Sequence, residues 1–237
     1  MTKKEIAIFD EKQIASVGIN EYAMAKNSTK QTINESGIGK LIIPKVAIDL
    51  PILAGIANQN LLTGASTYRK DQQLGKDNYV LLTHNIYDKD LLFQRIEELK
   101  TGDVIYATDF DSMYTYEVFL NEVVVETETN YIEKESDREL ITLLRCEGDI
   151  GTIYRRLVQG KLKNKESLDT FNKAELNELN LVTQASKTEG VLLTKDPISK
   201  ADKVGINLAA KVVVDPIQTI IPIFLLFLMP ILFFSLI

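Results

Sequence analysis

The chain has 237 residues, of which 45% are hydrophobic and 25% are charged, so it is long enough to bury a sizeable core. Its formal net charge of −6, its pI near 5.0 and the lack of a basic tract with interleaved aromatic residues exclude a nucleic-acid-binding function. A single cysteine excludes an intrachain disulfide framework and leaves a free thiol.

Residues 1–36 are polar, and their few apolar residues are scattered without a period. We interpret this segment as an N-terminal leader, in which Asn27 to Thr32 forms a linker. The segment contains no apolar stretch long enough for a signal peptide, so we expect flanking residues that this sequence does not include.

Residues 37–163 contain a succession of short, strand-like apolar runs. One of them, Val46 to Leu53, loses its alternation at Pro51, which is typical of an edge or bulged strand. Leu91 to Leu99 instead has apolar residues at helical spacing. Further strands are predicted over Val104 to Ala107, Met113 to Val125 and Glu139 to Cys146, with the acidic connection Glu126 to Arg138 before the last of them. The succession predicts a domain built mostly of strands.

Three reactive side chains lie at the ends of such runs. Cys146, the only cysteine, and His84, the only histidine, each end an apolar run, and the pair Arg155-Arg156 begins another. A thiol, an imidazole and a guanidinium at strand ends are the parts of a thiol acyl-transfer site. A lone cysteine beside leucines is also typical of an inert buried residue, and a lone histidine of a structural one. The surrounding motifs favour the catalytic interpretation.

Those motifs resemble the motifs of sortases, the cysteine transpeptidases of Gram-positive cell surfaces. Thr142-Leu143-Leu144-Arg145-Cys146 resembles the T-L-x-T-C nucleophile strand of that family, and Arg155 to Leu162 resembles its R-h-h-V-x-G-x-L strand, where h is apolar. The other matching stretches, in order and at family spacing, are Ile38 to Ile52 (I-G-x-L-x-I-P-x-h-x-h-x-L-P-I), Gly64-Ala65-Ser66, Leu92-Phe93 followed by Gly102 to Tyr106, and Tyr114 to Val118. The resemblance therefore covers residues 37–163.

The resemblance implies a mostly β fold: a closed, eight-stranded, sortase-like β-barrel with short helices. It implies that Cys146 attacks a peptide carbonyl and forms a thioester, while His84 protonates the leaving amine and later deprotonates the incoming amine. Arg155 is expected to donate hydrogen bonds to the oxyanion, because it holds the family position five residues before Gly160. Arg156 must then face the other way on the same strand.

The resemblance also implies the reactants. The substrates are expected to be LPXTG-bearing surface proteins, cleaved between Thr and Gly. The acceptor is expected to be the amine of a peptidoglycan precursor.

Three positions depart from the family pattern. Arg145 stands where the family has Thr, Arg156 where an apolar residue is usual, and Thr83 where Gly or Ser is commoner. Alternation along the strand places Arg145 on the face opposite Cys146. There we expect it to disturb the support of the strand, and so to alter substrate preference and rate rather than the type of reaction.

Two segments follow the barrel. Residues 164–215 are polar, and Lys165 to Val182 is rich in helix formers, which indicates a partly helical stalk. Residues 216–237 carry no charge, and at helical rise they span roughly 30 Å, the thickness of a bilayer core. We therefore predict a C-terminal transmembrane helix in a single-pass protein of the cell membrane. Because sortases act outside the cell, the resemblance places the catalytic domain on the extracellular face.

Three functions remain open. Tyr114 to Val118, and the lack of an aspartate–aromatic lid motif in residues 1–36, favour a class A-like sortase that anchors many LPXTG proteins. The nine-residue spacing from Cys146 to Arg155 and the apolar C-terminal segment favour a class C-like, pilin-polymerising sortase. Arg145 alone favours a catalytically weak, membrane-tethered binding barrel.

The sequence predicts neither a cofactor nor a metal ion. Calcium-stimulated members of the family use carboxylates in loops, and this chain has an acidic group in a predicted loop: Glu126, Glu128, Glu133 and Glu135. Such a run of charges is usually a solvated loop, so calcium stimulation is not predicted.

Overall fold

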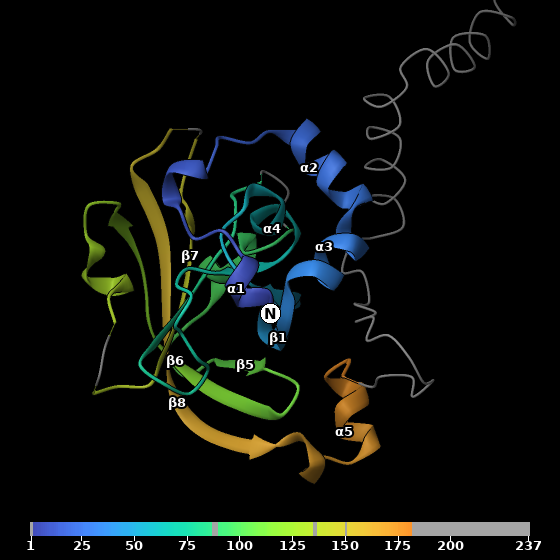
Figure 1. The fold of residues 1–237 in the computed structure, drawn as a ribbon. Helices are drawn as coiled ribbons and strands as arrows, with labels where there is room; N and C mark the ends of the chain where they lie inside the picture. Colours follow the sequence, from blue (N-terminus) through green and yellow to red (C-terminus); the bar gives the residue numbers. More distant parts are fainter. Residues whose placement is uncertain (1, 87–89, 135–136, 150, 182–237) are drawn as a thin grey trace, which may run out of the picture.

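The computed structural model describes residues 2–86, 90–134, 137–149 and 151–181. In this part of the chain eight strands close into a barrel in the order β1-β2-β3-β4-β7-β8-β6-β5 (Figure 1). Their bounds are β1 (Gly37–Ile43), β2 (Ile48–Leu53), β3 (Ala65–Thr67), β4 (Asn78–Leu82), β5 (Val104–Thr108), β6 (Ser112–Val125), β7 (Leu140–Cys146) and β8 (Tyr154–Ser167). The predicted mostly β, closed eight-stranded barrel is confirmed.

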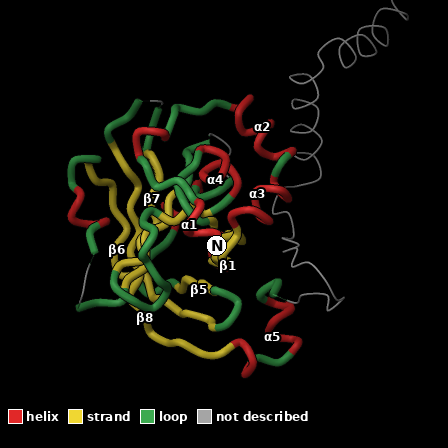
Figure 2. Tube along the Cα trace, in the orientation of Figure 1, coloured by secondary structure: helices red, strands yellow, loops and turns green. Residues whose placement is uncertain are grey.

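Short helices surround the strands, as the red segments in Figure 2 show. The α-helices are α1 (Lys3–Ile6), α2 (Ile19–Asn27), α3 (Thr29–Ser36), α4 (Asn58–Thr63) and α5 (Lys173–Glu178). The 3₁₀-helices are η1 (Glu11–Gln13), η2 (Pro44–Val46), η3 (Gln94–Glu98), η4 (Thr129–Ile132) and η5 (Leu168–Thr170). α2, α3 and α4 pack against one another, and α3 also contacts β1 and β2.

Two parallel strands, β4 and β7, bring distant parts of the sequence to one end of the sheet. Their inward-facing side chains are at most 3% exposed and belong to the core: Tyr79, Leu81, Ile141 and Leu143. The register pairs Leu82 with Leu144. His84 and Cys146 each lie two residues further on, so both follow the same end of the two strands.

The helical spacing of Leu91 to Leu99 corresponds to η3 and the turn before it. Phe93, Ile96 and Leu99 are 0–3% exposed and join the core cluster. Their burial fixes the main chain of residues 91–99 against the barrel, at the end where β7 ends.

The N-terminal segment differs from the expected leader, because Asn27 to Thr32, predicted as a linker, lies in α2 and α3. Its hydroxyl side chains bond back to the helices; Thr32 Oγ1, for example, donates to the Ser28 carbonyl at 3.0 Å. Tyr22 and Ile33 are 4% and 5% exposed and anchor the two helices. The apolar pattern showed no period because each helix is short and the chain turns between them at Ser28.

The segment predicted as a stalk begins as part of the barrel, since β8 continues to Ser167. Beyond it, the chain after α5 is held by Lys40 of β1, which is fully buried and donates from Nζ to the Asn180 carbonyl at 2.8 Å. Lys40 is also ion-paired with Asp49 at 3.0 Å, and Asn180 Nδ2 donates to Asp49 at 2.9 Å. These contacts form a clamp, Lys40–Asp49–Asn180.

The rest of the predicted stalk and the predicted transmembrane segment, residues 216–237, lie outside the described residues. Among the residues that the structure describes, no helix is both long enough and apolar enough to cross a bilayer.

Candidate active site

Strands β7 and β8 place the predicted nucleophile beside the predicted arginine. In their antiparallel register Cys146 is paired with Arg155, and Arg145 is paired with Arg156. Paired residues on such a ladder point to the same face, and neighbours along a strand point to opposite faces. Cys146 and Arg155 therefore share one face of the sheet, whereas Arg145 and Arg156 share the other.

A cavity of about 210 Å³ brings the three predicted site residues together. Cys146, His84 and Arg155 all line it, together with residues of the β7–β8 connection and of the N-terminal segment. The thiol is half-buried. A nucleophile, a proton carrier and a hydrogen-bond donor around one space can act on a single carbonyl group, which is what thiol acyl transfer requires.

Arg155 is held by the loop that precedes it. Its guanidinium donates to the carbonyl oxygens of Thr152 at 2.8 Å and Tyr154 at 2.9 Å, and it forms an ion pair with Glu126. The side chain remains 22% exposed. In the sequence Glu126 is only one member of an acidic loop, and a run of charges does not indicate a partner on a strand far along the chain.

His84 lies in a setting that favours the neutral imidazole. It is 8% exposed, and burial lowers the pKa of His84 to about 4. Its main-chain N–H donates to the carbonyl of Leu61 at 3.0 Å, which ties the residue to α4.

Asn58 of α4 fixes the tautomer of this histidine. Its Oδ1 lies 3.1 Å from Nε2 of His84 and also accepts from the main-chain N–H of Ala15 at 3.1 Å. Its Nδ2 donates to the carbonyl of Gln13 at 3.3 Å, which sets the orientation of the amide. Because Oδ1 can only accept, Nε2 of neutral His84 carries the proton and Nδ1 holds the lone pair.

Residues 14–17 of the N-terminal segment line the same cavity. The segment is held before and within this stretch: Ile8 accepts a hydrogen bond from the N–H of Ile56 at 2.8 Å, and Ala15 donates to Asn58. Neither this placement nor the contact between Asn58 and His84 was predicted, because a polar stretch without a period does not indicate where it packs.

Within the described residues, no group of three or more histidine, cysteine, aspartate or glutamate side chains is placed to hold a metal ion. Of the four glutamates considered from the sequence, Glu126 pairs with Arg155, and Glu135 lies outside the described residues.

The chain is similar to known proteins of a single family. The family profile described as "Sortase domain" matches residues 41–163. Sortase A of Listeria monocytogenes is 37% identical over 131 residues, which cover 55% of this chain and 59% of that protein. Sortase A of Bacillus anthracis is 35% identical over 160 residues, which cover 68% of this chain and 73% of that protein. The match thus spans less than two thirds of the Listeria relative.

A solved structure gives the same result for the fold. The crystal structure of Listeria monocytogenes sortase A superposes with a TM-score of 0.58 at 34% sequence identity. The superposition covers 62% of this chain and 99% of that chain.

Proposed function

Because this chain belongs to the sortase family, we propose that it acts as a class A-like cysteine transpeptidase. The observation that carries the proposal is the shared cavity of Cys146, His84 and Arg155. The proposed substrate is an LPXTG-like sorting signal, cleaved between Thr and Gly, and the proposed acceptor is the amine of a cell-wall precursor. The similarity to two proteins named sortase A favours the class A-like function over the class C-like one.

The low pKa of His84 determines the protonation state of the imidazole before the first half-reaction. Near pH 7 the imidazole is neutral, so the proton that leaves Cys146 during attack passes to His84. The S–C bond to the Thr carbonyl forms and an oxyanion develops. As the C–N bond breaks, the imidazolium returns its proton to the leaving amine of Gly. A thioester, a free amine and a neutral His84 remain.

The burial that lowers the pKa of His84 also makes it a weak base for a thiol proton. Residues 14–17 contribute to the walls around it.

Arg155 is the proposed donor to the oxyanion. A guanidinium keeps its proton at any physiological pH, so it stabilises the developing charge by hydrogen bonding alone. Two of its present acceptors, the carbonyls of Thr152 and Tyr154, are neutral, and the third is the carboxylate of Glu126. An oxyanion in place of either carbonyl forms a stronger, charge-assisted hydrogen bond.

The second half-reaction reverses the proton path. The incoming amine attacks the thioester, His84 accepts a proton from it, and the C–S bond breaks. The proton then returns to the sulfur of Cys146, so the enzyme ends as it began. The scheme needs no cofactor.

We also propose where in the cell the protein is located. The uncharged residues 216–237 would anchor the protein in the cell membrane, with the barrel on the extracellular face, where surface proteins and cell-wall precursors meet.

Incubating the full chain with a fluorogenic LPXTG peptide and an amine tests the function. We expect cleavage between Thr and Gly and, with amine present, a transpeptidation product detectable by mass spectrometry. Cys146→Ala is the matched control and should give neither product. If the unsubstituted chain binds the peptide without turnover, it is the weak binding barrel. A backbone-linked pilin polymer would identify the class C-like function instead.

A further inference from the structure

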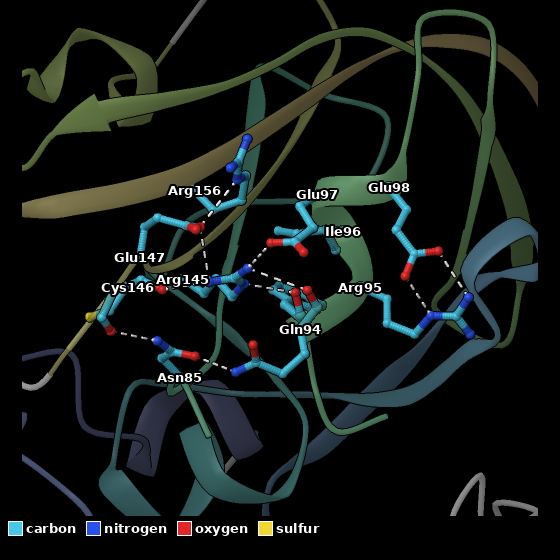
Figure 3. A network of polar contacts seen from close by, with 12 residues as sticks. Asn85, Gln94, Arg95, Ile96, Glu97, Glu98, Arg145, Cys146, Glu147 and Arg156 are labelled. Atoms are coloured by element: carbon cyan, nitrogen blue, oxygen red, sulfur yellow. Dashed lines mark hydrogen bonds and ion pairs between the residues drawn. The ribbon is translucent and has the colours of Figure 1, made fainter. Parts of the chain in front are cut away.

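Arg145, the departure from the family's nucleophile motif, is a buried residue in the structure. It is 4% exposed and lies on the face of β7 opposite Cys146. Figure 3 shows its guanidinium at the centre of a polar network that joins the end of β7 to η3 and to Glu147. A buried charge is tolerated only where its donors are satisfied, so the partners of Arg145 show what it holds.

Four hydrogen bonds and an ion pair hold the guanidinium of Arg145. It donates to the carbonyl oxygens of Phe93 (3.0 Å), Gln94 (3.3 Å) and Cys146 (2.8 Å) and to the carboxylate of Glu97 (3.0 Å), and Nη1 is ion-paired with Glu147 at 3.0 Å. A guanidinium presents its donors in a rigid fork, and all three nitrogens of this one donate a hydrogen bond.

One arm of the network ends on the nucleophile. Nη1 of Arg145 donates to the carbonyl oxygen of Cys146 itself and is ion-paired with the next residue, Glu147. Glu147 is also bound by Arg156 at 3.2 Å. The peptide group that follows Cys146 is therefore fixed from the inner face of the strand.

The other arm leads to the histidine. Arg145 holds the main chain of Gln94, and the side chain of Gln94 donates to Oδ1 of Asn85, the residue after His84. Asn85 Nδ2 in turn donates to the carbonyl of Gly148 at 3.1 Å, just beyond Cys146 on the chain. The contacts thus form a closed circuit through both segments of the site.

We propose that Arg145 is a positioning residue that sets the placement of Cys146 relative to His84. It acts through the Cys146 carbonyl and, by way of Gln94 and Asn85, through the segment that follows His84. This inference rests on the proposed function. It replaces the expectation that Arg145 disturbs the support of the strand, since four hydrogen bonds and an ion pair hold the side chain in place.

Arg145→Lys in the full chain tests the proposal. Lysine keeps the charge but has three donors on a flexible stem, so it cannot hold both arms. We expect kcat for the LPXTG peptide to fall by roughly 10- to 100-fold, because small misplacements of reacting groups have effects of that size. KM should stay within about twofold, since Arg145 does not line the cavity. The pH profile of Cys146 alkylation by iodoacetamide should shift as well.

Arg95→Lys is the matched control. Arg95 lies on the same η3 helix but forms a surface ion pair with Glu98 at 2.9 Å, with 33% and 49% of the two side chains exposed. The kcat and the alkylation profile of the Arg95→Lys variant should equal those of the unsubstituted chain. An equal loss in both variants would overturn the proposal, because it would reflect the stability of η3 and not the circuit.

Gln94→Ala provides a second test of the proposal. It leaves the Gln94 carbonyl for Arg145 but removes the side chain that reaches Asn85. A fall in kcat without a rise in KM supports the proposal even if Arg145→Lys fails to fold. If Arg145→Lys folds and its kcat is unchanged, the proposal is overturned. If Arg145→Lys does not fold, an unchanged kcat in Gln94→Ala overturns it.

The alkylation profile separates this proposal from the function on which it rests. If the unsubstituted chain does not turn over the peptide, the proposed function fails. The profiles of the unsubstituted chain and Arg145→Lys then still decide the positioning role: a shift supports it, and identical profiles overturn it.

Discussion

The two faces of the β7–β8 ladder use their arginines in opposite ways. On the cavity face, Arg155 is 22% exposed and bonds to two neutral main-chain carbonyls and one carboxylate. On the opposite face, Arg145 is 4% exposed and is held by four hydrogen bonds and an ion pair with Glu147. The same residue type thus lies beside a cavity on one face and within a buried polar network on the other.

This difference follows from one property of strands. Arg145 and Cys146 are neighbours in sequence, so alternation sends them to opposite faces, as it does Arg155 and Arg156. A face that meets a cavity leaves room for a ligand, whereas a face that meets packed segments must satisfy every buried polar group. Substitutions on the two faces should therefore differ in kind as well as in size.

The largest effect is expected at Cys146. Cys146→Ala should lower peptide cleavage and transpeptidation by more than about 10³-fold, because the chain has no other thiol. Cys146→Ser should be nearly as inactive, since an alcohol gives up its proton far less readily than a thiol. Assays of both variants with the fluorogenic peptide check this. An alanine variant with more than a few per cent of normal turnover would contradict it.

The next effect separates Arg155 from Arg156. Arg155→Ala should lower kcat/KM by roughly 10²–10³, the usual cost of losing one oxyanion donor. Arg155→Lys should recover little, because an ammonium does not reproduce the guanidinium fork. Arg156→Ala, on the other face, should leave kcat/KM within a few-fold. The reverse order would mean that the strand is shifted by one residue, which exchanges its two faces.

A stability effect is expected from His84. Its folded-state pKa of about 4 lies below the unfolded value of 6.5, so the stabilising contribution is complete above pH 6.5 and is lost as the pH falls towards 4. Between pH 7.5 and pH 5 this group should lower the free energy of unfolding by roughly 2 kcal/mol. Urea unfolding at both pH values, compared with His84→Gln, isolates the effect. Equal pH dependence in the two proteins would show that His84 is not the source.

The smallest effect concerns the N-terminal segment on the cavity face. Removing residues 2–17 should raise the pKa of His84 towards 6.5, because burial is the cause of its shift. The chain has one histidine, so a single set of imidazole resonances in an NMR titration reports this value. Lys12→Ala, an exposed change on the same segment, is the control and should leave the pKa unchanged. A pKa that stays near 4 after the deletion would show that the rest of the chain, and not residues 2–17, buries His84.

The strand patterns predicted a domain built mostly of strands, and the resemblance to sortases supplied the closed barrel and the candidate site. Cys146 and His84 each end an apolar run, and Arg155 was preferred to Arg156 by its position in the family motif. Alternation then placed the two arginines on opposite faces, as the register has them. Such patterns do not predict contacts between segments that lie far apart in the chain. Asn58 and Glu126 are ordinary polar residues in the sequence, and only the folded chain brings them to His84 and Arg155.

The prediction for Arg145 was incomplete for a related reason. The sequence showed correctly which face it occupies, but not what lies there. Its partners include three main-chain carbonyls, which have no signature in a sequence because every residue carries one. The effect of a buried polar residue therefore depends on tertiary packing that patterns of residue type do not describe.

The clamp formed by Lys40, Asp49 and Asn180 has a mechanical consequence. A pull applied to the chain after Leu181 reaches the carbonyl of Asn180 and the fully buried ammonium of Lys40 before it reaches β8. Lys40 stands on β1, on a different strand from Arg155, so the load enters the barrel far from the nucleophile in sequence. The clamp would have to break before tension could peel β8 from its neighbours and separate Arg155 from Cys146. While the clamp holds, a force on the C-terminal side therefore acts on β1 and not on β8.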